Sequence, residues 1–290
     1  MSHILHKPFL KWAGGKSQIA YAISAHMPPS CSRLVEPFVG SASVALNVVG
    51  ASSHLLSDVN HDLISVYQAL VLDGMGFIDE CRSLFTPENN TEDAYVRLRR
   101  EFNSSADEHR KACLFVYLNR HCFNGLMRYN ASGVFNTPFG RYRSPVVPEE
   151  SMRRFLIVLG KAQFMESDFR PVVSLSGKGD FVYADPPYVP VGKTGFTAYA
   201  KGGFSINDHY DLARLCEEAA ARGAVVVVSN HDNDATRKIY SNASAIHTLM
   251  VKRTISGTGD SRNAAAELLA VYGGQSKNDN SIFGDHPDAV

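Results

Sequence analysis

The segment Asp185-Pro186-Pro187-Tyr188 places a carboxylate, two prolines and an aromatic ring directly after an apolar run. Two prolines fix φ twice and remove two N–H donors, so the main chain is stiff there and its carbonyl groups are free to accept hydrogen bonds. An ionised aspartate likewise only accepts hydrogen bonds. The Asp185 carboxylate and the Pro186 carbonyl are therefore suited to hold an exocyclic NH2 group, and a ring could stack on Tyr188. An ordinary exit from a strand into a turn would use the same residue types.

Three further positions suit a nucleotide-like ligand. Pro37-Phe38-Val39-Gly40 follows one short apolar run, and Asp58 follows the next. A glycine lets the main chain approach a ligand closely, and an acid at the end of the following strand can bind ribose hydroxyls. Asp168, after an expected strand over 162–165, could accept from an adenine amino group or could simply be solvated. Many α/β proteins carry such a glycine turn, so these positions alone are a weak signal.

A Gly-Gly-Lys turn lies near the N-terminus. Gly15-Lys16-Ser17 supplies the last three fixed letters of a phosphate-binding P-loop,. The first glycine of that motif would have to be residue 10, which is Leu10. A P-loop ATPase is therefore disfavoured, and the turn must have another role.

The composition is that of an ordinary globular protein. The 290 residues are 44% hydrophobic and 20% charged, enough for one large or two modest domains,. No run approaches the roughly 18 apolar residues of a membrane span, and the first residues do not resemble a secretion signal. The five cysteines are scattered without a C-x-x-C pair, which favours reduced thiols over a disulfide frame or a zinc site,. We therefore expect a cytoplasmic protein with no metal and no membrane partner.

The charge is unevenly distributed. The formal net charge is zero, which by itself argues against a nucleic-acid binder. Residues 97–143, however, contain nine basic and three acidic residues, an excess of six positive charges. A local basic face on a neutral chain suits a polyanion that is gripped in one place. A solvated helix surface would explain the cluster over 97–111 about as well.

The order of expected elements is that of an interrupted α/β domain. Strands are expected over 34–36 and 54–57, with a helix between them that ends near Val49. A run of helices follows, over 62–72, 75–85, 91–102 and 108–120, and then an Asn/Gly-rich segment with a hairpin turn at Gly133. The α/β alternation returns with strands over 179–183 and 225–228 and a helix that Ser205 and Asp208 cap,. We predict one doubly wound sheet with a helical insertion.

Six motifs occur in one order, at 10–16, 36–44, 58–64, 118–142, 185–188 and 229–232: LKWAGGK, EPFVGSASV, DVNHDLI, LNRHCFNGLMRYNASGVFNTPFGRY, DPPY and SNHD. Together they resemble the Dam-type DNA adenine-N6 methyltransferases of the alpha group, the D12 class, from Phe9 to Tyr272. This resemblance implies a Rossmann-like S-adenosylmethionine-dependent methyltransferase sheet with an inserted, mostly helical recognition domain that carries a β-hairpin. The implied division is a catalytic domain over 1–61 and 148–273, a target-recognition domain over 62–147, and a polar tail over 274–290.

The resemblance also assigns roles to residues of the methyl-transfer site. It implies S-adenosyl-L-methionine as cofactor and N6 of a flipped-out adenine as acceptor, with Asp185, Pro186 and Tyr188 as the catalytic residues. Lys16 would pair with the methionine carboxylate of the cofactor. The implied cofactor-binding residues are Trp12, Ala13, Lys16, Phe38, Gly40, Asp58, Asp168 and Asp185.

The implied partner is double-stranded DNA, and the implied target is GATC. Arg128 would read a guanine through O6 and N7, and Lys11 would reach the first guanine. Phe123 stands where relatives carry a tyrosine that inserts into the base stack, so the aromatic face is kept and the hydroxyl is lost. The implied DNA-binding residues are Lys11, Phe123, Asn124, Leu126, Arg128, Asn136, Pro138, Arg141 and Tyr142.

Two alternatives remain open. The same chemistry could act on another short sequence, as part of a restriction–modification pair or a phage system, so the setting could be a bacterial nucleoid or a phage-infected cell. A non-catalytic DNA-binding relative is disfavoured because the segment from Asp185 to Tyr188 is intact. Nothing in the sequence indicates an obligate protein partner.

Overall fold

The computed structural model describes residues 5–189, 203–252 and 264–274. The chain forms two compact units, the first made of residues 1–17, 39–47 and 54–167 and the second of residues 18–38, 48–53 and 168–290. The predicted recognition segment, 62–147, lies wholly within the first unit, which also includes neighbouring parts of the chain. The functional division at residues 61 and 147 stays a prediction. In the described ranges no helix has the length and apolar character needed to cross a membrane.

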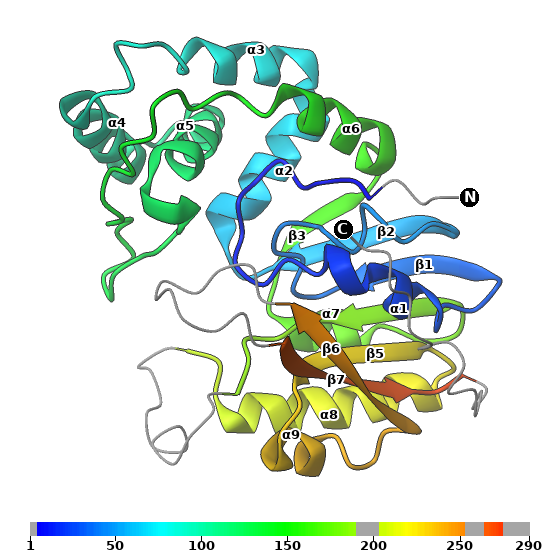
Figure 1. Cartoon of the computed structure of the whole chain (residues 1–290). Helices are drawn as coiled ribbons and strands as arrows, with labels where there is room; N and C mark the ends of the chain where they lie inside the picture. The colour runs from blue at the N-terminus through cyan, green and yellow to red at the C-terminus, as the bar shows by residue number, and fades with distance from the viewer. Residues whose placement is uncertain (1–4, 190–202, 253–263, 275–290) are drawn as a thin grey trace. The chain divides into compact units, whose positions relative to one another are not determined.

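Within the described residues, seven strands form one sheet in the order β3-β2-β1-β4-β5-β7-β6 (Figure 1). The pairs β1–β4, β4–β5 and β2–β3 are parallel, whereas β7 is antiparallel to both β5 and β6. The predicted α/β fold is confirmed. The strands are β1 Cys31–Glu36, β2 Ala51–Asp58, β3 Gln163–Glu166, β4 Asp180–Ala184, β5 Val225–His231, β6 Ala245–Lys252 and β7 Ala264–Tyr272.

Within the second unit, β1 and β4 are neighbours although more than a hundred residues separate them in the chain. Val35 of β1 pairs with Val182 of β4, and Ala184 of β4 pairs with Val228 of β5. After β1 the chain adds β2 and β3 on one side of it, and it then returns to add β4 and β5 on the other side. Open α/β sheets bind ligands outside the carboxyl ends of the strands at such a switch point. Residues that follow β1, β4 and β5 are thus the first candidates for a site.

The helices of the first unit begin where the sequence supplies caps. They are α2 His61–Asp73, α3 Met75–Ser83, α4 Glu92–Ser104, α5 Glu108–His121 and α6 Glu149–Leu159. The side chains of Asn60, Thr91 and Asp107 accept main-chain N–H groups at the starts of α2, α4 and α5,. The four predicted helices of this region are confirmed to within two residues at each end.

Aromatic packing holds this unit together. The Tyr67 ring of α2 stacks on the Phe155 ring of α6 with centroids 5.0 Å apart. Phe9 and Phe164 meet the same pair, and all four side chains are buried. The N-terminal segment and β3 are therefore part of the core that α2 and α6 build.

The second unit contains α7 Phe169–Ser174, α8 Ile206–Ala221 and α9 Asp234–Ile239, and a 3-10 turn, Ser17–Ile19, leads into α1 Ala20–Ser24. The predicted capping box of α8 is confirmed. The Ser205 side chain accepts from the Asp208 N–H, and the Asp208 carboxylate accepts from the Ser205 N–H at 2.7 Å. The helix ends before Gly223, whose φ of +96° suits a glycine,.

The helix expected to end near Val49 is wrong, because residues 38–47 form a series of turns. Gly40 and Ala42, just before the expected helix, have φ values of +46° and +58°,. The Asn47 N–H then donates to the Val44 carbonyl at 2.8 Å, three residues back, where an α-helix needs a bond to residue 43,. The Asn47 side chain accepts from the His6 N–H and donates to the Ser43 carbonyl. The Ser43 carbonyl thus accepts from the Asn47 side chain, whereas in an α-helix it would accept from the Asn47 N–H,.

The hairpin turn expected at Gly133 forms, but its two arms are not strands. Gly133 has a φ of +72°, and the Asn130 N–H donates to the Val134 carbonyl at 2.9 Å. The arms meet in two isolated antiparallel bridges, Tyr129 with Phe135 and Cys122 with Phe139. Main-chain bonds also join the arms, from the Asn136 N–H to the Arg128 carbonyl and from the Phe123 N–H to the Pro138 carbonyl, so the segment is an irregular hairpin.

His61, the first residue of α2, joins three elements of the first unit. Its Nδ1 lies 2.7 Å from a Glu166 oxygen of β3, and its Nε2 lies 3.0 Å from a Glu108 oxygen of α5. The Glu166 bond and then the Glu108 bond raise the pKa of His61 above its usual value. Protonated His61 therefore cross-links two carboxylates, although all three side chains are about half exposed.

We predict that this contact makes stability depend on pH. A histidine whose folded-state pKa is raised contributes its full stabilisation below about pH 6.5 and loses it as pH rises through the folded-state value. Replacement His61→Ala should lower the free energy of unfolding by up to about 1 kcal/mol at mildly acidic pH, because exposed pairs contribute little. Urea unfolding of both proteins at several pH values measures this difference. A difference that stays constant across neutral pH would contradict the contact.

Candidate active site

The Asp185 carboxylate is oriented by the neighbouring strand. The Ser229 hydroxyl of β5 donates to Asp185 Oδ1 at 2.7 Å, and the Tyr183 hydroxyl lies 2.8 Å from the Ser229 oxygen. Because Ser229 gives its only proton to the carboxylate, Tyr183 donates to Ser229. The parallel register of β4 and β5 places Asp185 and Ser229 at the same level of the sheet. A hydrogen-bonded relay thus fixes one carboxylate oxygen and the orientation of the group.

The rest of the Asp185–Tyr188 segment follows the end of β5. Pro186 is buried, whereas Pro187 is exposed. The Tyr188 ring meets the His231 ring edge to face with centroids 4.5 Å apart. Burial raises the pKa of Tyr188 well above its usual value, so its phenol stays neutral. The Val189 N–H donates to the Asn230 side chain at 3.3 Å, which places the end of the segment beside β5 as well.

A buried carboxylate that sequence reasoning missed lies at the end of β1. Glu36 is 2% exposed and is the last residue of the strand that pairs with β4. Its signal in the sequence was an acid directly before Pro37-Phe38, inside a run that otherwise reads as apolar. Glu36, at the end of β1, and Asp185, just after β4, therefore lie at the carboxyl ends of adjacent strands within one unit.

Phe38 and Asp168 occupy two further positions of the second unit. The Phe38 ring stacks on the Phe169 ring with centroids 5.5 Å apart. The exposed Asp168 carboxylate accepts from the Arg170 N–H at 2.9 Å and pairs with its guanidinium at 3.2 Å. Asp168 is thus the cap of α7. Its predicted cofactor contact stays a prediction.

In the first unit, Trp12, Gly40 and Asp58 come together. The Gly40 N–H donates to Asp58 Oδ2 at 3.1 Å, and the Asn60 N–H donates to Oδ1 at 3.0 Å. Burial raises the pKa of Asp58 even though these main-chain donors lower it. The Trp12 indole lies directly on Gly40, where an added Cβ would come within 3.1 Å of two indole atoms. A side chain here would push the indole aside by a few tenths of an ångström, and the φ of +46° also favours glycine,.

The Gly-Gly-Lys turn packs on the same part of the unit. The Lys16 N–H donates to the Ser43 hydroxyl at 2.9 Å, and its ammonium donates to the Gly14 carbonyl at 2.9 Å. Lys16 is only 7% exposed, whereas Ala13 is exposed. The ammonium of Lys16 is therefore held close to the main chain of its own turn.

Asn119 connects the N-terminal segment to the predicted recognition loop. Its buried side chain accepts from the Lys11 N–H and donates to the Lys11 carbonyl, both at 2.8 Å. It also donates to the Gly125 carbonyl at 3.3 Å. An added Cβ at Gly125 would come within 2.7 Å of Lys11 side-chain atoms. One amide thus holds the segment before Trp12 against the loop after α5, and sequence reasoning missed it.

The predicted DNA-contacting residues lie mostly on the surface of this loop. Phe123 and Leu126 are 54% and 44% exposed, so both apolar side chains are accessible on the surface of the loop. Arg128 Nε donates to the Asn136 side chain at 3.0 Å, so two predicted readers are neighbours. The other exposed members are Asn124, Asn136, Pro138 and Arg141, while Lys11 and Tyr142 are half-buried.

Tyr142 and Arg141 have defined contacts as well. The Tyr142 hydroxyl accepts from the Asn124 N–H at 3.0 Å, and the Lys11 ammonium lies 4.3 Å from the centre of the Tyr142 ring. Burial, and then the charge of Arg120, lowers the pKa of Lys11. Arg141 pairs with Glu92 at 3.1 Å and remains 77% exposed. Tyr142 therefore supports the loop from within.

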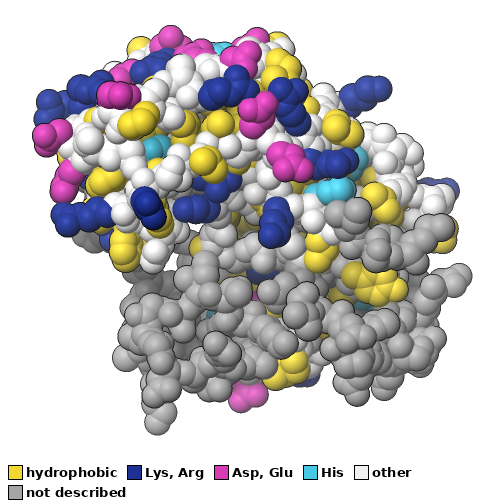
Figure 2. Space-filling view, turned by 45° about the horizontal axis from the view of Figure 1, so that its top comes forward, with side chains coloured by type: hydrophobic (Ala, Val, Ile, Leu, Met, Phe, Trp, Pro, Cys, Tyr) yellow, Lys and Arg dark blue, Asp and Glu magenta, His cyan; other side chains and the backbone are white. Residues whose placement is uncertain are grey.

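The predicted excess of positive charge in this unit is partly paired. Figure 2 shows Lys and Arg side chains among acidic ones over the helices of the first unit. Arg110 pairs with Glu101, and Lys111 pairs with Asp62, which also accepts from the Tyr129 hydroxyl at 2.6 Å. The exposed arginines of the loop and of α4, such as Arg100, Arg128 and Arg143, remain on the surface.

The chain resembles DNA-modifying enzymes over nearly its whole length. It is 43% identical to a DNA adenine methylase of Serratia marcescens over 92% of this chain and 98% of that protein. It is 41% identical to that of Escherichia coli K12, over 92% and 95% of the two chains. An rRNA methyltransferase from Streptomyces viridochromogenes, 14% identical with a TM-score of 0.36 over 93% and 90% of the two chains, is too distant to add to this.

Residues 12–255 match the family described as D12 class N6 adenine-specific DNA methyltransferase. This range includes the carboxyl ends of β1, β2, β4 and β5 and the whole loop after α5. With relatives above 40% identity that cover nine tenths of the chain, the assignment does not depend on one motif. The chain belongs to the D12 class of N6 adenine-specific DNA methyltransferases and is an adenine-specific DNA methyltransferase.

Proposed function

We propose that the chain transfers a methyl group from S-adenosyl-L-methionine to N6 of an adenine in GATC within double-stranded DNA. The observation that carries this proposal is the Asp185 carboxylate, which Ser229 holds at the end of β4 beside a main chain stiffened by two prolines. A fixed carboxylate next to a proline carbonyl offers two acceptors for the two N–H groups of an exocyclic amine.

The role of Asp185 and Pro186 follows from the chemistry of the acceptor. The lone pair of adenine N6 is delocalised into the ring, so the amine is a weak nucleophile. When the Asp185 carboxylate and the Pro186 carbonyl each accept a hydrogen bond from one N6–H group, the lone pair is directed away from the ring plane. Transfer would form the N–C bond as the C–S bond of the methyl donor breaks, and one N6 proton would pass by way of the Asp185 carboxylate to solvent. Positioning and fixed electrostatics supply most of the rate in such a step.

The cofactor-facing roles are assigned to residues whose groups fit it. When bound, S-adenosyl-L-methionine supplies an activated methyl group on a sulfonium. Asp58, with a carboxylate held by two main-chain N–H groups, would accept from ribose hydroxyls. Trp12 would offer its indole face, and Lys16 its ammonium to the methionine carboxylate. Ala13, Phe38, Gly40, Asp168 and Asp185 complete the proposed set, and the buried Glu36 is an additional acceptor for the methionine ammonium.

Recognition is assigned to the loop after α5. A stacked base cannot reach Asp185, so the adenine must be flipped out at a cost of a few kcal/mol. Stacking on Tyr188 would offset part of this, at roughly 1–3 kcal/mol per base. Exposed Phe123 would fill the gap in the duplex, and Arg128 would read a guanine through O6 and N7,. Asn136, which accepts from Arg128, would orient its guanidinium.

A second setting remains compatible with the same residues. The enzyme could act on another short sequence, in a restriction–modification pair or a phage system. The exposed loop residues Leu126, Asn124 and Pro138 would then contact other base edges or methyl groups. The chemistry at Asp185 would not change.

A duplex assay tests the proposed target. Purified protein with methyl-labelled S-adenosyl-L-methionine should label the adenine of duplexes that contain GATC, and it should label duplexes with a permuted site far less. The chain has a single tryptophan, Trp12, so its fluorescence should change when the cofactor binds. Equal labelling of both duplexes would refute GATC, and an unchanged fluorescence would remove Trp12 from the cofactor site.

Replacement Asp185→Ala should lower the rate of transfer by at least about a hundredfold, as for loss of one preorganised polar group in other enzymes. Because Asp185 acts mainly on the amine, binding of the cofactor should be retained, as Trp12 fluorescence would report. Single-turnover rates measure the effect, with the exposed Asp234→Ala of α9 as the matched control. A near-normal rate in the Asp185 variant would exclude the proposed mechanism.

Replacement Arg128→Ala should relax discrimination at one guanine of the site by about 1–3 kcal/mol. Methylation rates on GATC and on its single-base variants measure this, and Arg154→Ala on α6, also an exposed arginine, is the control. The loss should appear at one base pair only. If the preference among the variants were unchanged, Arg128 would have no role in reading.

A further inference from the structure

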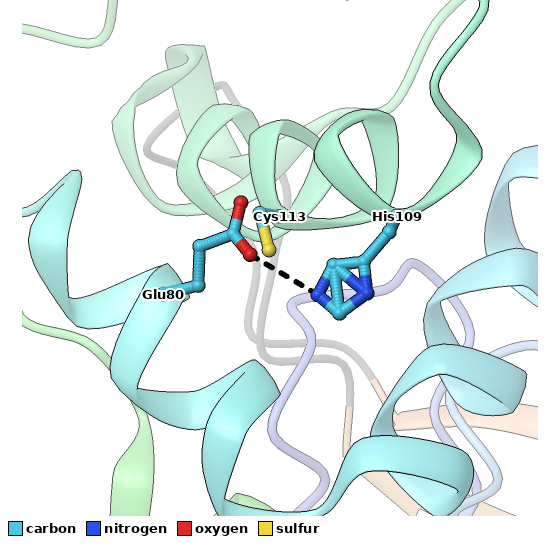
Figure 3. A group of neighbouring side chains, drawn as sticks. All are labelled: Glu80, His109 and Cys113. Carbon is cyan, nitrogen blue, oxygen red and sulfur yellow. Dashed lines mark ion pairs between the residues drawn. The ribbon is translucent and has the colours of Figure 1, made fainter.

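Three side chains that can bind a metal meet between α3 and α5 of the first unit. They are Glu80, His109 and Cys113, and one possible ligand atom of each lies within 4.8 Å of the other two. Figure 3 shows the Glu80 carboxylate from α3 facing the His109 ring and the Cys113 thiol, both from α5. His109 and Cys113 are four residues apart, so they lie on one face of the helix.

The geometry is close to that of a bound ion. His109 Nε2 lies 3.1 Å from a Glu80 oxygen. A tetrahedral zinc ion with bonds of about 2.0–2.3 Å separates its ligand atoms by about 3.5 Å. The three ligand atoms lie within 4.8 Å of one another, so side-chain rotation would have to bring them to this spacing around one ion. Asp73, at the end of α2, lies 3.8 Å from His109 Nε2 and adds negative charge beside the site.

The donor set selects the type of metal. Thiolate, imidazole and carboxylate together suit Zn²⁺, whereas Mg²⁺ and Ca²⁺ prefer oxygen ligands alone. Glu80 and His109 are about 40% exposed, and Cys113 is buried. The site is thus reachable from solvent on one side, where water would be the fourth ligand.

We propose that Glu80, His109 and Cys113 form a zinc site that cross-links α3 and α5. The Cys113 proton is released to solvent as the Zn–S bond forms. The scattered cysteines gave no sign of this in the sequence, because the ligands come from two helices and no C-x-x-C pair is needed. The site is independent of the proposed methyl transfer, since eight residues, or about 12 Å of helix, separate Cys113 from the end of α5,.

Titration of the untagged full chain with Zn²⁺ alone tests the site. After removal of metal under reducing conditions, calorimetry should detect one equivalent of tightly bound Zn²⁺. Glu80→Gln and His109→Ala should each weaken this binding by at least about tenfold. His54→Ala on β2 is the matched control and should bind as the parent does. Binding equal in Glu80→Gln, in His109→Ala and in the parent would overturn the site.

Co²⁺ gives a direct signature of the thiolate. The parent loaded with Co²⁺ should show a sulfur-to-metal charge-transfer band, which Cys113→Ser should lose and Cys31→Ser on β1 should keep. Added Zn²⁺ should also raise the thermal unfolding temperature of the parent more than that of Glu80→Gln, by mass action. Glu80→Gln removes only a partly exposed charge, so this comparison holds even if Cys113→Ser fails to fold. The absence of the band in the parent, or an equal temperature rise in both proteins, would refute the proposal.

Discussion

The hydrogen bond from Ser229 to Asp185 is the contact on which the proposed chemistry depends. A carboxylate on a loop would sample many orientations, and a weak amine cannot select one of them without cost. Here the carboxylate follows directly from β4, is stiffened by prolines and is held from β5. The parallel register of β4 and β5 places Ser229 beside Asp185, and the bond between them fixes the direction of one carboxylate oxygen. Tyr183 extends the relay into the buried sheet, so the proton of Ser229 has one stable direction.

A second constraint acts in the first unit, where one amide serves two segments. Asn119 holds Lys11 by both its N–H and its carbonyl, and it also donates to the Gly125 carbonyl of the recognition loop. A movement of the loop at Gly125 would therefore strain the Asn119 bonds to Lys11, the residue before Trp12. The proposed reader of DNA and the proposed cofactor turn are thus mechanically joined within one compact unit, without a direct contact between Arg128 and Trp12 being needed.

Local sequence signals predicted most helices and strands, whereas contacts between residues far apart in the sequence could not be predicted. The capping box of Ser205 and Asp208 and the helices of the first unit were readable because caps and periodicity lie within a few residues. The helix expected near Val49 does not form, because the Asn47 side chain takes the Ser43 carbonyl and bonds to His6, which is 41 residues away. Ser229 and Asp185 are 44 residues apart, and Asn119 and Lys11 are 108 apart, so no local pattern links them. Most roles of the site residues came from family resemblance and not from physical patterns.

Helix α5 connects the proposed metal site to the recognition loop. Its first two turns carry His109 and Cys113, its last turn carries Asn119, and the recognition loop follows at once. A helix end is held only as firmly as the contacts along its length, because fraying begins where packing stops. Burial of nine residues of α5 anchors its centre, while Asp107 caps its start. An ion between α3 and α5 would add a fixed point one turn inside that cap. The position of the exposed Phe123 and Arg128 then depends on the packing of α5, which lies outside the loop itself.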